Sequence, residues 1–330
     1  MLTKFVLDDE QLADLVAPVG RLASADPLSG GMFATAYRVH FADGSRAVAK
    51  IVGADTSRLY RYELGLLGTE ALTYRMLSGS GVPVPKVLHT DFSRSLVAAD
   101  VVVAEHLPGV PWLELQLDEA QNAVVRRRLG AVMADLHRVP APRFGYPAAV
   151  AALAGATWRE AFERMIDAVL DDAARWGVDL PAERVRAAVS AHSAALDAVA
   201  HPIVVHTDLW AGNVFVAPES LDIVGIIDTE RTLWGDPLHE LAGADQLGHG
   251  DPDADLLAGN TAAAGILADE LASPTGAARL QLSRLYFALI LSSEPVVRGY
   301  EGEWVAGYEQ TARENIERAL VLLEDAAARH

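Results

Sequence analysis

Several residue types and patterns are scarce in this chain, and each scarcity excludes a class of protein or site. There is no cysteine, which excludes a disulfide framework, a cysteine nucleophile and a thiolate metal site. No apolar run reaches the ~18 residues that a membrane span requires. Lysine is also rare. Only three of the 27 basic residues are lysines (Lys4, Lys50 and Lys86), so each of them stands out as a candidate for a specific role.

Length and charge narrow the remaining possibilities. The 330 residues suffice for about two domains and a sizeable core. The net charge of −18 argues against a nucleic-acid-binding surface and favours a cationic partner. Residues 107–330 carry a net charge of −16 and residues 1–106 only −2. The first residues are acidic where a signal peptide would be basic and then apolar, so we expect a cytoplasmic protein without membrane contact.

The chain changes character near residue 107, which predicts two lobes with a ligand cleft between them. Residues 1–106 hold β-rich runs at 36–41, 45–53 and 96–107 and a single helix over 62–81. Residues 107–330 are mostly helical, with helices expected at 118–138, 157–176, 181–199, 260–272, 276–298 and 305–328. The predicted fold class is therefore α+β, with an N-terminal antiparallel sheet and one main helix, followed by a larger helical lobe.

A strand-rich island at residues 201–230 interrupts the helices and carries the strongest chemical signal. The segment from His206 to Asn213 has the form H-x-D-x-x-x-x-N, and a following apolar strand delivers Asp228 twenty residues after Asp208. Phosphoryl transfer needs such a set. One carboxylate orients the attacking hydroxyl and takes its proton, while an amide and a second carboxylate hold magnesium against the phosphates. Asp, Asn and Gly are also ordinary turn residues, but their combination favours the catalytic interpretation.

Residues of the first lobe fit the phosphate-binding side of the same chemistry. Lys50 ends an A-V-A-K run that looks like the strand lysine gripping α- and β-phosphates. Glu70, in the one helix of this lobe, is its expected ion-pair partner, and Glu63 is the alternative. Gly30 and Gly31 precede a strand and could place backbone N–H groups over phosphates. That loop lacks the full G-x-G-x-x-G pattern, so a plain turn is the other interpretation.

Seven stretches, in order, resemble the aminoglycoside phosphotransferase and choline kinase family, small-molecule kinases with a protein-kinase-like fold. They are LSGGMFATAYRV, AVAK, TEALTYRMLSGSGVPVPKVL, VVVAEHLPGVPW, LGAVMADLHRVPAPRFGY, HTDLWAGNVFV and IIDTERTLWGDPLHELA. They cover residues 28–242. The resemblance implies ATP or GTP with Mg²⁺ as cofactors, a nucleotide-binding lobe at 1–106, and a catalytic loop and acceptor site within 107–330.

The same resemblance assigns the chemistry to individual residues. Asp208 corresponds to the catalytic aspartate, and Asn213 and Asp228 correspond to the metal ligands. Lys50 corresponds to the phosphate-binding lysine. Catalysis would then consist of positioning and electrostatic stabilisation of the transferring phosphoryl group, without a covalent enzyme intermediate.

Four further residues have supporting roles by resemblance. Glu105 and Leu107 belong to the segment that resembles the hinge whose backbone meets the adenine. His206 supports the catalytic loop by hydrogen bonds and is given no role in proton transfer. Asp236 resembles the buried aspartate that braces that loop, and it also fits the N-cap of the helix that follows.

The sequence departs from the family pattern in two places that bear on the acceptor. Thr229 and Glu230 follow Asp228, where the family commonly has Trp or Phe next. A polar segment over 246–255 lies within the helical lobe and includes Asp251, Asp253 and Asp255. It is either a solvated loop or, together with Glu230, a set of acids that recognises substrate ammonium groups.

The function predicted from the sequence is phosphorylation of a hydroxyl on a small, cationic acceptor such as an aminoglycoside or aminocyclitol. An amino sugar, a fructosamine or a choline-like alcohol is the alternative acceptor, and a nucleotide-binding pseudokinase is the alternative class. A protein kinase is disfavoured because no D-F-G, A-P-E or activation segment is present, and a zinc hydrolase because no H-E-x-x-H occurs. We expect no nucleic acid, membrane or obligate protein partner.

Overall fold

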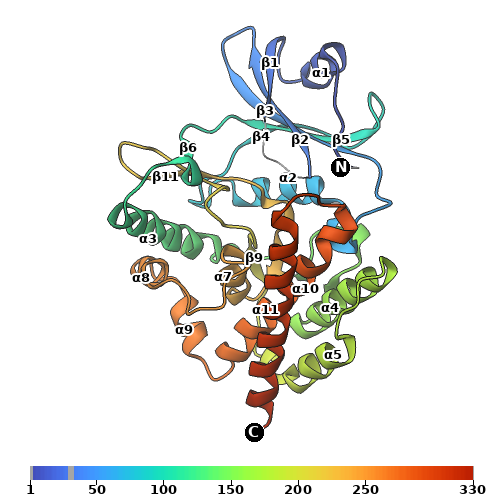
Figure 1. Ribbon diagram of the computed structural model, residues 1–330. Coiled ribbons are helices and arrows are strands. Elements are labelled where there is room, and N and C mark those ends of the chain that lie inside the picture. Colours follow the sequence, from blue (N-terminus) through green and yellow to red (C-terminus); the bar gives the residue numbers. More distant parts are fainter. Residues whose placement is uncertain (1–2, 29–32, 330) are drawn as a thin grey trace.

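The computed structural model describes residues 3–28 and 33–329. Its N-terminal part is a five-stranded antiparallel sheet in the order β1-β2-β3-β5-β4 (Figure 1). These strands are β1 (Leu22–Leu28), β2 (Thr35–Phe41), β3 (Arg46–Gly53), β4 (Val87–Asp91) and β5 (Ala99–Glu105). The predicted sheet is confirmed. Strands β1 and β4 extend it beyond the sequence prediction, which had treated the residues after Pro83 as an extended link.

The alternation of side chains along β3 gives the sheet two different faces. Ala47, Ala49 and Ile51 pack on the face covered by α1 (Asp9–Val16), a short helix that the sequence analysis did not predict. Val52 points to the opposite face and packs against α2 (Leu66–Leu77). Lys50 shares the parity of Val52, so the central strand of the sheet directs its one lysine towards α2.

The helix expected over 62–81 is divided in two. A 3₁₀ turn, η1 (Arg61–Glu63), precedes α2, and Gly65 between them has a left-handed backbone with φ of +79°. A side chain is disfavoured in that conformation, and a Cβ there would also lie 3.2 Å from the Cβ of Ala148. The glycine therefore separates the two helical segments and sets where α2 begins.

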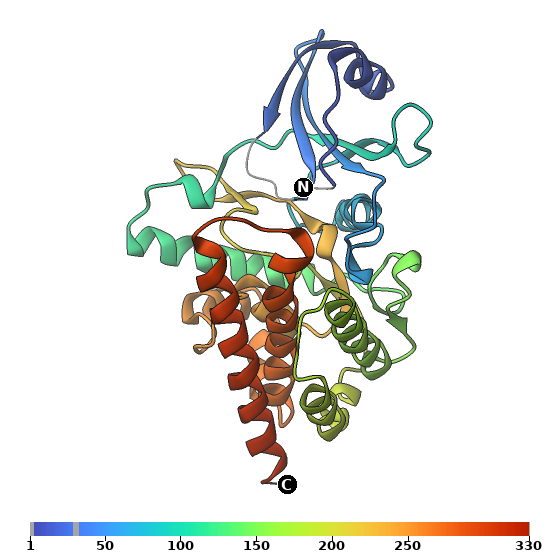
Figure 2. The same cartoon turned by 45° about the vertical axis from the view of Figure 1, so that its right-hand side comes forward.

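The second part of the molecule is mostly helical, as expected. Its long helices α10 and α11 run side by side, and the turn between them rises towards the sheet (Figures 1 and 2). The helices are α3 (Glu119–Leu136), α4 (Trp158–Arg175), α5 (Ala182–Ala191), α6 (Ser193–Asp197), α7 (Leu238–Ala244), α8 (Ala254–Ala262), α9 (Leu267–Ala272), α10 (Gly276–Arg298) and α11 (Trp304–Ala327). The helices expected at 181–199 and 260–272 are each interrupted, at His192 and at Ala264, whose φ is +55°. Within the described ranges, no helix is long and apolar enough to cross a bilayer.

The mostly helical part also contains two small sheets. One has the order β11-β10-β6 and the other β8-β7-β12-β9. Their strands are β6 (Val110–Pro111), β7 (Phe144–Gly145), β8 (Ala154–Gly155), β9 (Ile203–Val205), β10 (Val214–Val216), β11 (Ile223–Ile226) and β12 (Leu233–Gly235), and the remaining 3₁₀ turns are η2 (Trp112–Glu114), η3 (Ala149–Ala151) and η4 (Thr229–Arg231). The H-x-D-x-x-x-x-N segment is thus the connection from β9 to β10, and Asp228 lies between β11 and η4.

Candidate active site

The loop between β9 and β10 is held by buried side chains from both sides. The backbone N–H groups of His206 and Thr207 donate to the carboxylate of Glu240 on α7, at 2.7 and 2.9 Å. The His206 ring bridges two loops, since its Nε2 lies 2.9 Å from the carbonyl of Ile227 and its Nδ1 accepts the N–H of Asp208 at 3.3 Å. Burial lowers the pKa of His206, which suits a neutral ring that donates at Nε2 and accepts at Nδ1.

Asp208 is held by amide side chains at both carboxylate oxygens. Oδ2 accepts from Nδ2 of Asn213 at 3.1 Å, and Oδ1 accepts from Nε2 of Gln246 at 2.8 Å. Burial raises the pKa of Asp208 to about 7, although the guanidinium of Arg231 acts in the opposite direction. A carboxylate with such a pKa can take up a proton near neutral pH, which is the property that a general base needs.

The amide of Asn213 is oriented by two acceptors. Its Nδ2 donates to the backbone carbonyl of Asp208 at 2.8 Å as well as to the Asp208 carboxylate. Because both partners can only accept, the NH₂ end must face them and the Oδ1 end faces away. This leaves an amide oxygen, which is a ligand that magnesium accepts.

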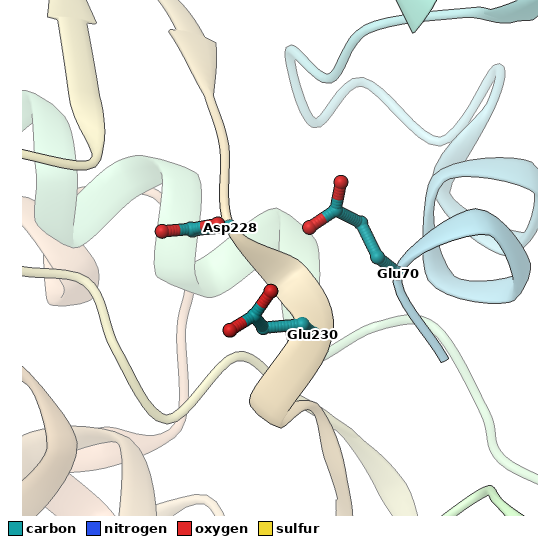
Figure 3. A group of neighbouring side chains, drawn as sticks. All are labelled: Glu70, Asp228 and Glu230. Atoms are coloured by element: carbon teal, nitrogen blue, oxygen red, sulfur yellow. The ribbon is translucent and has the colours of Figure 1, made fainter. Parts of the chain in front are cut away.

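A second cluster surrounds Lys50. Its Nζ donates to Glu70 and to Glu230 at 2.6 Å each, and it is also paired with Asp228. Figure 3 shows the three carboxylates from α2 and from the turn after β11 converging on one space. Of the two glutamates considered for Lys50, Glu70 is therefore the one in contact, whereas Glu63 pairs with Arg298.

The electrostatics of this cluster favour a cation. Burial alone would lower the pKa of Lys50, but the surrounding carboxylates hold it well above its ordinary value. Burial raises the pKa of Glu70 and Glu230 against the attraction of Lys50, whereas the ammonium overrides burial at Asp228 and lowers its pKa. Three carboxylates face a single ammonium, and one oxygen from each lies within 4.8 Å of the others. The negative charge in excess of the ammonium leaves Asp228, with its hard oxygen donors, suited to holding magnesium beside Lys50.

A buried charge network lies beyond Asp208. Arg231 of η4 donates to Glu294 of α10 at 2.9 Å, and its own carbonyl accepts the hydroxyl of Thr207 at 2.9 Å. Glu294 also forms an ion pair with Arg298 at 3.1 Å and accepts from Tyr308 of α11 at 3.4 Å. These contacts tie the catalytic loop, the turn after Asp228 and the α10–α11 pair into one framework.

Asp236 requires a correction. Its Oδ1 accepts from the N–H of Leu238, the first residue of α7, at 2.9 Å and from Arg279 of α10 at 3.1 Å. The backbone donors of the catalytic loop bind Glu240 instead. A carboxylate four residues further along the chain, on α7, therefore performs the bracing that the sequence analysis assigned to Asp236.

The expected nucleotide contacts are placed as follows. Glu105 ends β5, where it is exposed and its N–H donates to the carbonyl of Lys86 at 2.8 Å. Leu107 packs against Gly225 of β11, where a Cβ would lie 2.2 Å from the leucine side chain. The connection between the two parts thus runs over the β10–β11 hairpin. Gly30 and Gly31 lie outside the described residues.

The acids considered for ammonium recognition do not gather at Asp208. Glu230 is buried against Lys50. Asp253 caps α8 and pairs with Arg126 at 3.1 Å, and Asp255 pairs with Arg127 of α3 at 2.6 Å. Asp251 is exposed in the loop before α8. The polar segment reaches Asp208 through the amide of Gln246 and not through these carboxylates.

Sequence reasoning missed four contributors to the site, namely Gln246, Glu240, Arg231 and Glu294. All but Arg231 come from helices or loops well after the H-x-D motif. Arg231 and Glu240 lie within the last family-like stretch and Gln246 begins the polar segment, but no motif singles these residues out. Only the buried position of Glu240 on a helix otherwise lined with apolar residues offered a signal, because a carboxylate there needs partners.

Comparisons with known proteins agree with this geometry. The model of the phosphotransferase enzyme family matches residues 24–276. No curated protein matches the sequence. The structure of aminoglycoside phosphotransferase APH(4)-Ia is similar, with a TM-score of 0.65 and 16% identity over 95% of this chain and 98% of that chain.

Two other solved structures extend the comparison. A ternary complex of a thermostable mutant of APH(4)-Ia with AMP-PNP and hygromycin B gives a TM-score of 0.64 and 16% identity, over 93% of this chain and 96% of that chain. The structure of a protein from Thermobifida fusca YX-ER1, assigned as a fructosamine-3-kinase, gives a TM-score of 0.65 and 22% identity, over 94% of this chain and 97% of that chain. At these identities the likenesses show the fold, and they confirm its protein-kinase-like class.

Proposed function

The chain belongs to the phosphotransferase enzyme family, and from that premise we propose that it is an ATP- or GTP-dependent O-phosphotransferase acting on a hydroxyl of a small molecule. The observation that carries the proposal is the pairing of two groups. Asp208 and Asn213 form one, and Lys50 with its three carboxylates forms the other. A phosphoryl transfer needs both a base for the acceptor and charged groups for the phosphates.

In the proposed reaction the acceptor hydroxyl oxygen forms a bond to the γ-phosphorus. The bond from that phosphorus to the β–γ bridging oxygen breaks, and the nucleoside diphosphate leaves with the electron pair. Asp208 orients the hydroxyl and takes its proton. Lys50 neutralises phosphate charge, and Glu70 holds the lysine in place. Magnesium, held by Asn213 and Asp228, would supply charge neutralisation at the phosphates.

Residues 1–106 are proposed as the nucleotide-binding lobe and residues 107–330 as the lobe with the catalytic loop and the acceptor site. The backbone of residues 105–107 would meet the base. Nucleotide binding is supported by the AMP-PNP complex of the similar APH(4)-Ia mutant. The intact set of Lys50, Asp208, Asn213 and Asp228 argues against a pseudokinase, which has no chemical need of all four.

The leading acceptor is an aminoglycoside or aminocyclitol. The hygromycin B complex of the similar APH(4)-Ia mutant supports this class. The net charge of −16 over residues 107–330 adds only a long-range attraction for cations, since the acids considered for ammonium recognition do not gather at Asp208. The similarity to a protein assigned as a fructosamine-3-kinase keeps a fructosamine as the second candidate.

The test is a nucleotide-consumption assay with ATP and with GTP across hygromycin B, glucosamine, a fructosyl-lysine, ethanolamine and choline. Acceptor-dependent release of nucleoside diphosphate by the wild type, and its loss in Asp208→Asn, would support the proposal. Nucleotide binding without turnover of any member, with the same result for Asp208→Asn, would favour the pseudokinase.

A further inference from the structure

Gln246 has no role in the reaction described above, yet it touches the proposed base. It lies between α7 and α8, is half-buried, and its Nε2 is 2.8 Å from Oδ1 of Asp208 and 3.5 Å from the carbonyl of Thr207. Both partners can only accept, so the NH₂ end of the amide faces them. The carbonyl oxygen Oε1 is therefore directed away from the Asp208 carboxylate.

The segment that carries Gln246 is fixed from several sides. Gly243 of α7 packs directly on the catalytic loop, because a Cβ there would lie 2.3 Å from the carbonyl of Thr207. Asn315 of α11 donates to the carbonyl of Leu247 at 3.1 Å, and Arg284 of α10 donates to the carbonyl of Gly250 at 2.5 Å. The amide is thus held in place before any acceptor binds, as precise positioning of a reactive group requires.

The hydrogen-bonding capacity of Asp208 defines where an acceptor can bind. Each carboxylate oxygen has two lone pairs, and Gln246 uses one of those on Oδ1. A hydroxyl that donates to the other lone pair lies beside the amide of Gln246. The group on the neighbouring carbon of such an acceptor would then lie within reach of Oε1, which can only accept a hydrogen bond.

We propose that Gln246 is an acceptor-positioning residue that selects molecules with a hydrogen-bond donor on the carbon next to the reacting hydroxyl. This inference rests on the proposed function and deepens it. The chemical class is vicinal diols and vicinal amino alcohols, as found in sugars and cyclitols. Choline falls outside the class, because its quaternary nitrogen carries no N–H, whereas ethanolamine falls within it.

The experiment compares Gln246→Leu with Gln310→Leu, which makes the same change at an exposed glutamine bonded to Glu314 on α11. Kinetics are measured with hygromycin B, ethanolamine and choline, together with the KM for ATP. We expect Gln246→Leu to lower kcat/KM for the best acceptor by about 10- to 100-fold, the size of one hydrogen bond to a charged group. The KM for ATP should stay within about twofold, since a positioning role concerns the acceptor and not the nucleotide.

The wild type should also prefer ethanolamine to choline by about tenfold or more, and Gln246→Leu should reduce that preference. Equal kcat/KM values for Gln246→Leu and Gln310→Leu, or a wild type that prefers choline, would overturn the inference and leave the proposed function standing. Failure of the wild type to use any acceptor of the panel would overturn both. If Gln246→Leu does not fold, Gln246→Asn serves the same comparison, because its shorter side chain withdraws the amide from Asp208.

Discussion

Asp208 and Asp228 follow two strands of the same island, but their surroundings drive their pKa values apart. Asp208 is half-buried between two amides, and its desolvation raises its pKa to about 7. Asp228 is also desolvated, yet the ammonium of Lys50 overrides that effect and lowers its pKa. Pairs of carboxylates with opposite shifts have different chemical roles. The first is suited to proton transfer, and the second to remaining charged beside phosphates and a cation.

The largest effect on catalysis is expected from a change at Asp208, the carboxylate with the raised pKa. Asp208→Asn keeps the shape of the side chain but cannot take a proton, so we expect kcat to fall by about 10²–10⁴-fold. Binding of ATP, measured by titration calorimetry, should change by no more than a few fold because the nucleotide side is untouched. A variant with wild-type turnover would remove Asp208 from its proposed role.

The next effect concerns the framework that holds Asp208. Glu240→Gln replaces one of the two acceptor oxygens by an NH₂ group, so one N–H of the loop loses its acceptor and the other keeps only a neutral one. Hydrogen bonds to charged groups contribute about 1.5–3 kcal/mol, so we expect a loss of about 2–3 kcal/mol in the free energy of unfolding, measured with urea. Glu301→Gln, at an exposed position, is the control and should change stability little. Equal stabilities for both variants would show that Glu240 does not brace the loop.

The second half of the comparison is tested by Asp228→Asn. Removing this charge takes away a partner of Lys50 and a proposed metal ligand, so magnesium-dependent nucleotide binding should weaken by about 10- to 100-fold. The measurement is a magnesium titration of nucleotide affinity. Asp222→Asn, a change in the nearby β10–β11 connection, should leave the titration unaltered. A wild-type magnesium requirement in Asp228→Asn would contradict the assignment.

The smallest effect is the pH dependence. The raised pKa of Asp208 means that its carboxyl group is protonated below about 7 and cannot act as a base, so kcat/KM should fall about tenfold per pH unit on the acid side. Asp228, whose pKa is lowered, stays ionised over the same range and adds no acid limb. A pH–rate profile between about pH 5 and 9 checks this. A flat profile through neutral pH would show that the two carboxylates do not differ in the way proposed.

Much of the chemistry was readable from local patterns. The H-x-D-x-x-x-x-N spacing, the apolar strand before Asp228 and the A-V-A-K run indicated where four site residues lie. Glu70 was expected to pair with Lys50, with Glu63 as the alternative, and the folded chain brings Glu70 to the lysine because α2 covers the face of β3 that carries it. The strands β1 and β4 were harder to predict, since Pro27 lies within β1 and two prolines precede β4.

The acids of residues 107–330 do not lie where the net charge suggested. A net charge of −16 is a property of the composition, but it does not place any carboxylate. The folded chain binds Asp253 and Asp255 to arginines of α3 and Glu230 to Lys50, far from the role that composition suggested. The acceptor side of Asp208 is instead shaped by an uncharged amide, that of Gln246.

Periodicity and motif spacing were enough to predict the α+β fold class and to propose the loop from His206 to Asn213 as the catalytic loop. Which side chains hold that loop, which acids pair with arginines and which amide faces Asp208 became defined only in the folded molecule. The physical reason is that a hydrogen bond or ion pair depends on distances of about 3 Å between atoms. The residues through which α7, α10 and α11 contact the loop do not recur at a regular spacing in the sequence. Only the packing of the whole molecule brings their atoms to that distance.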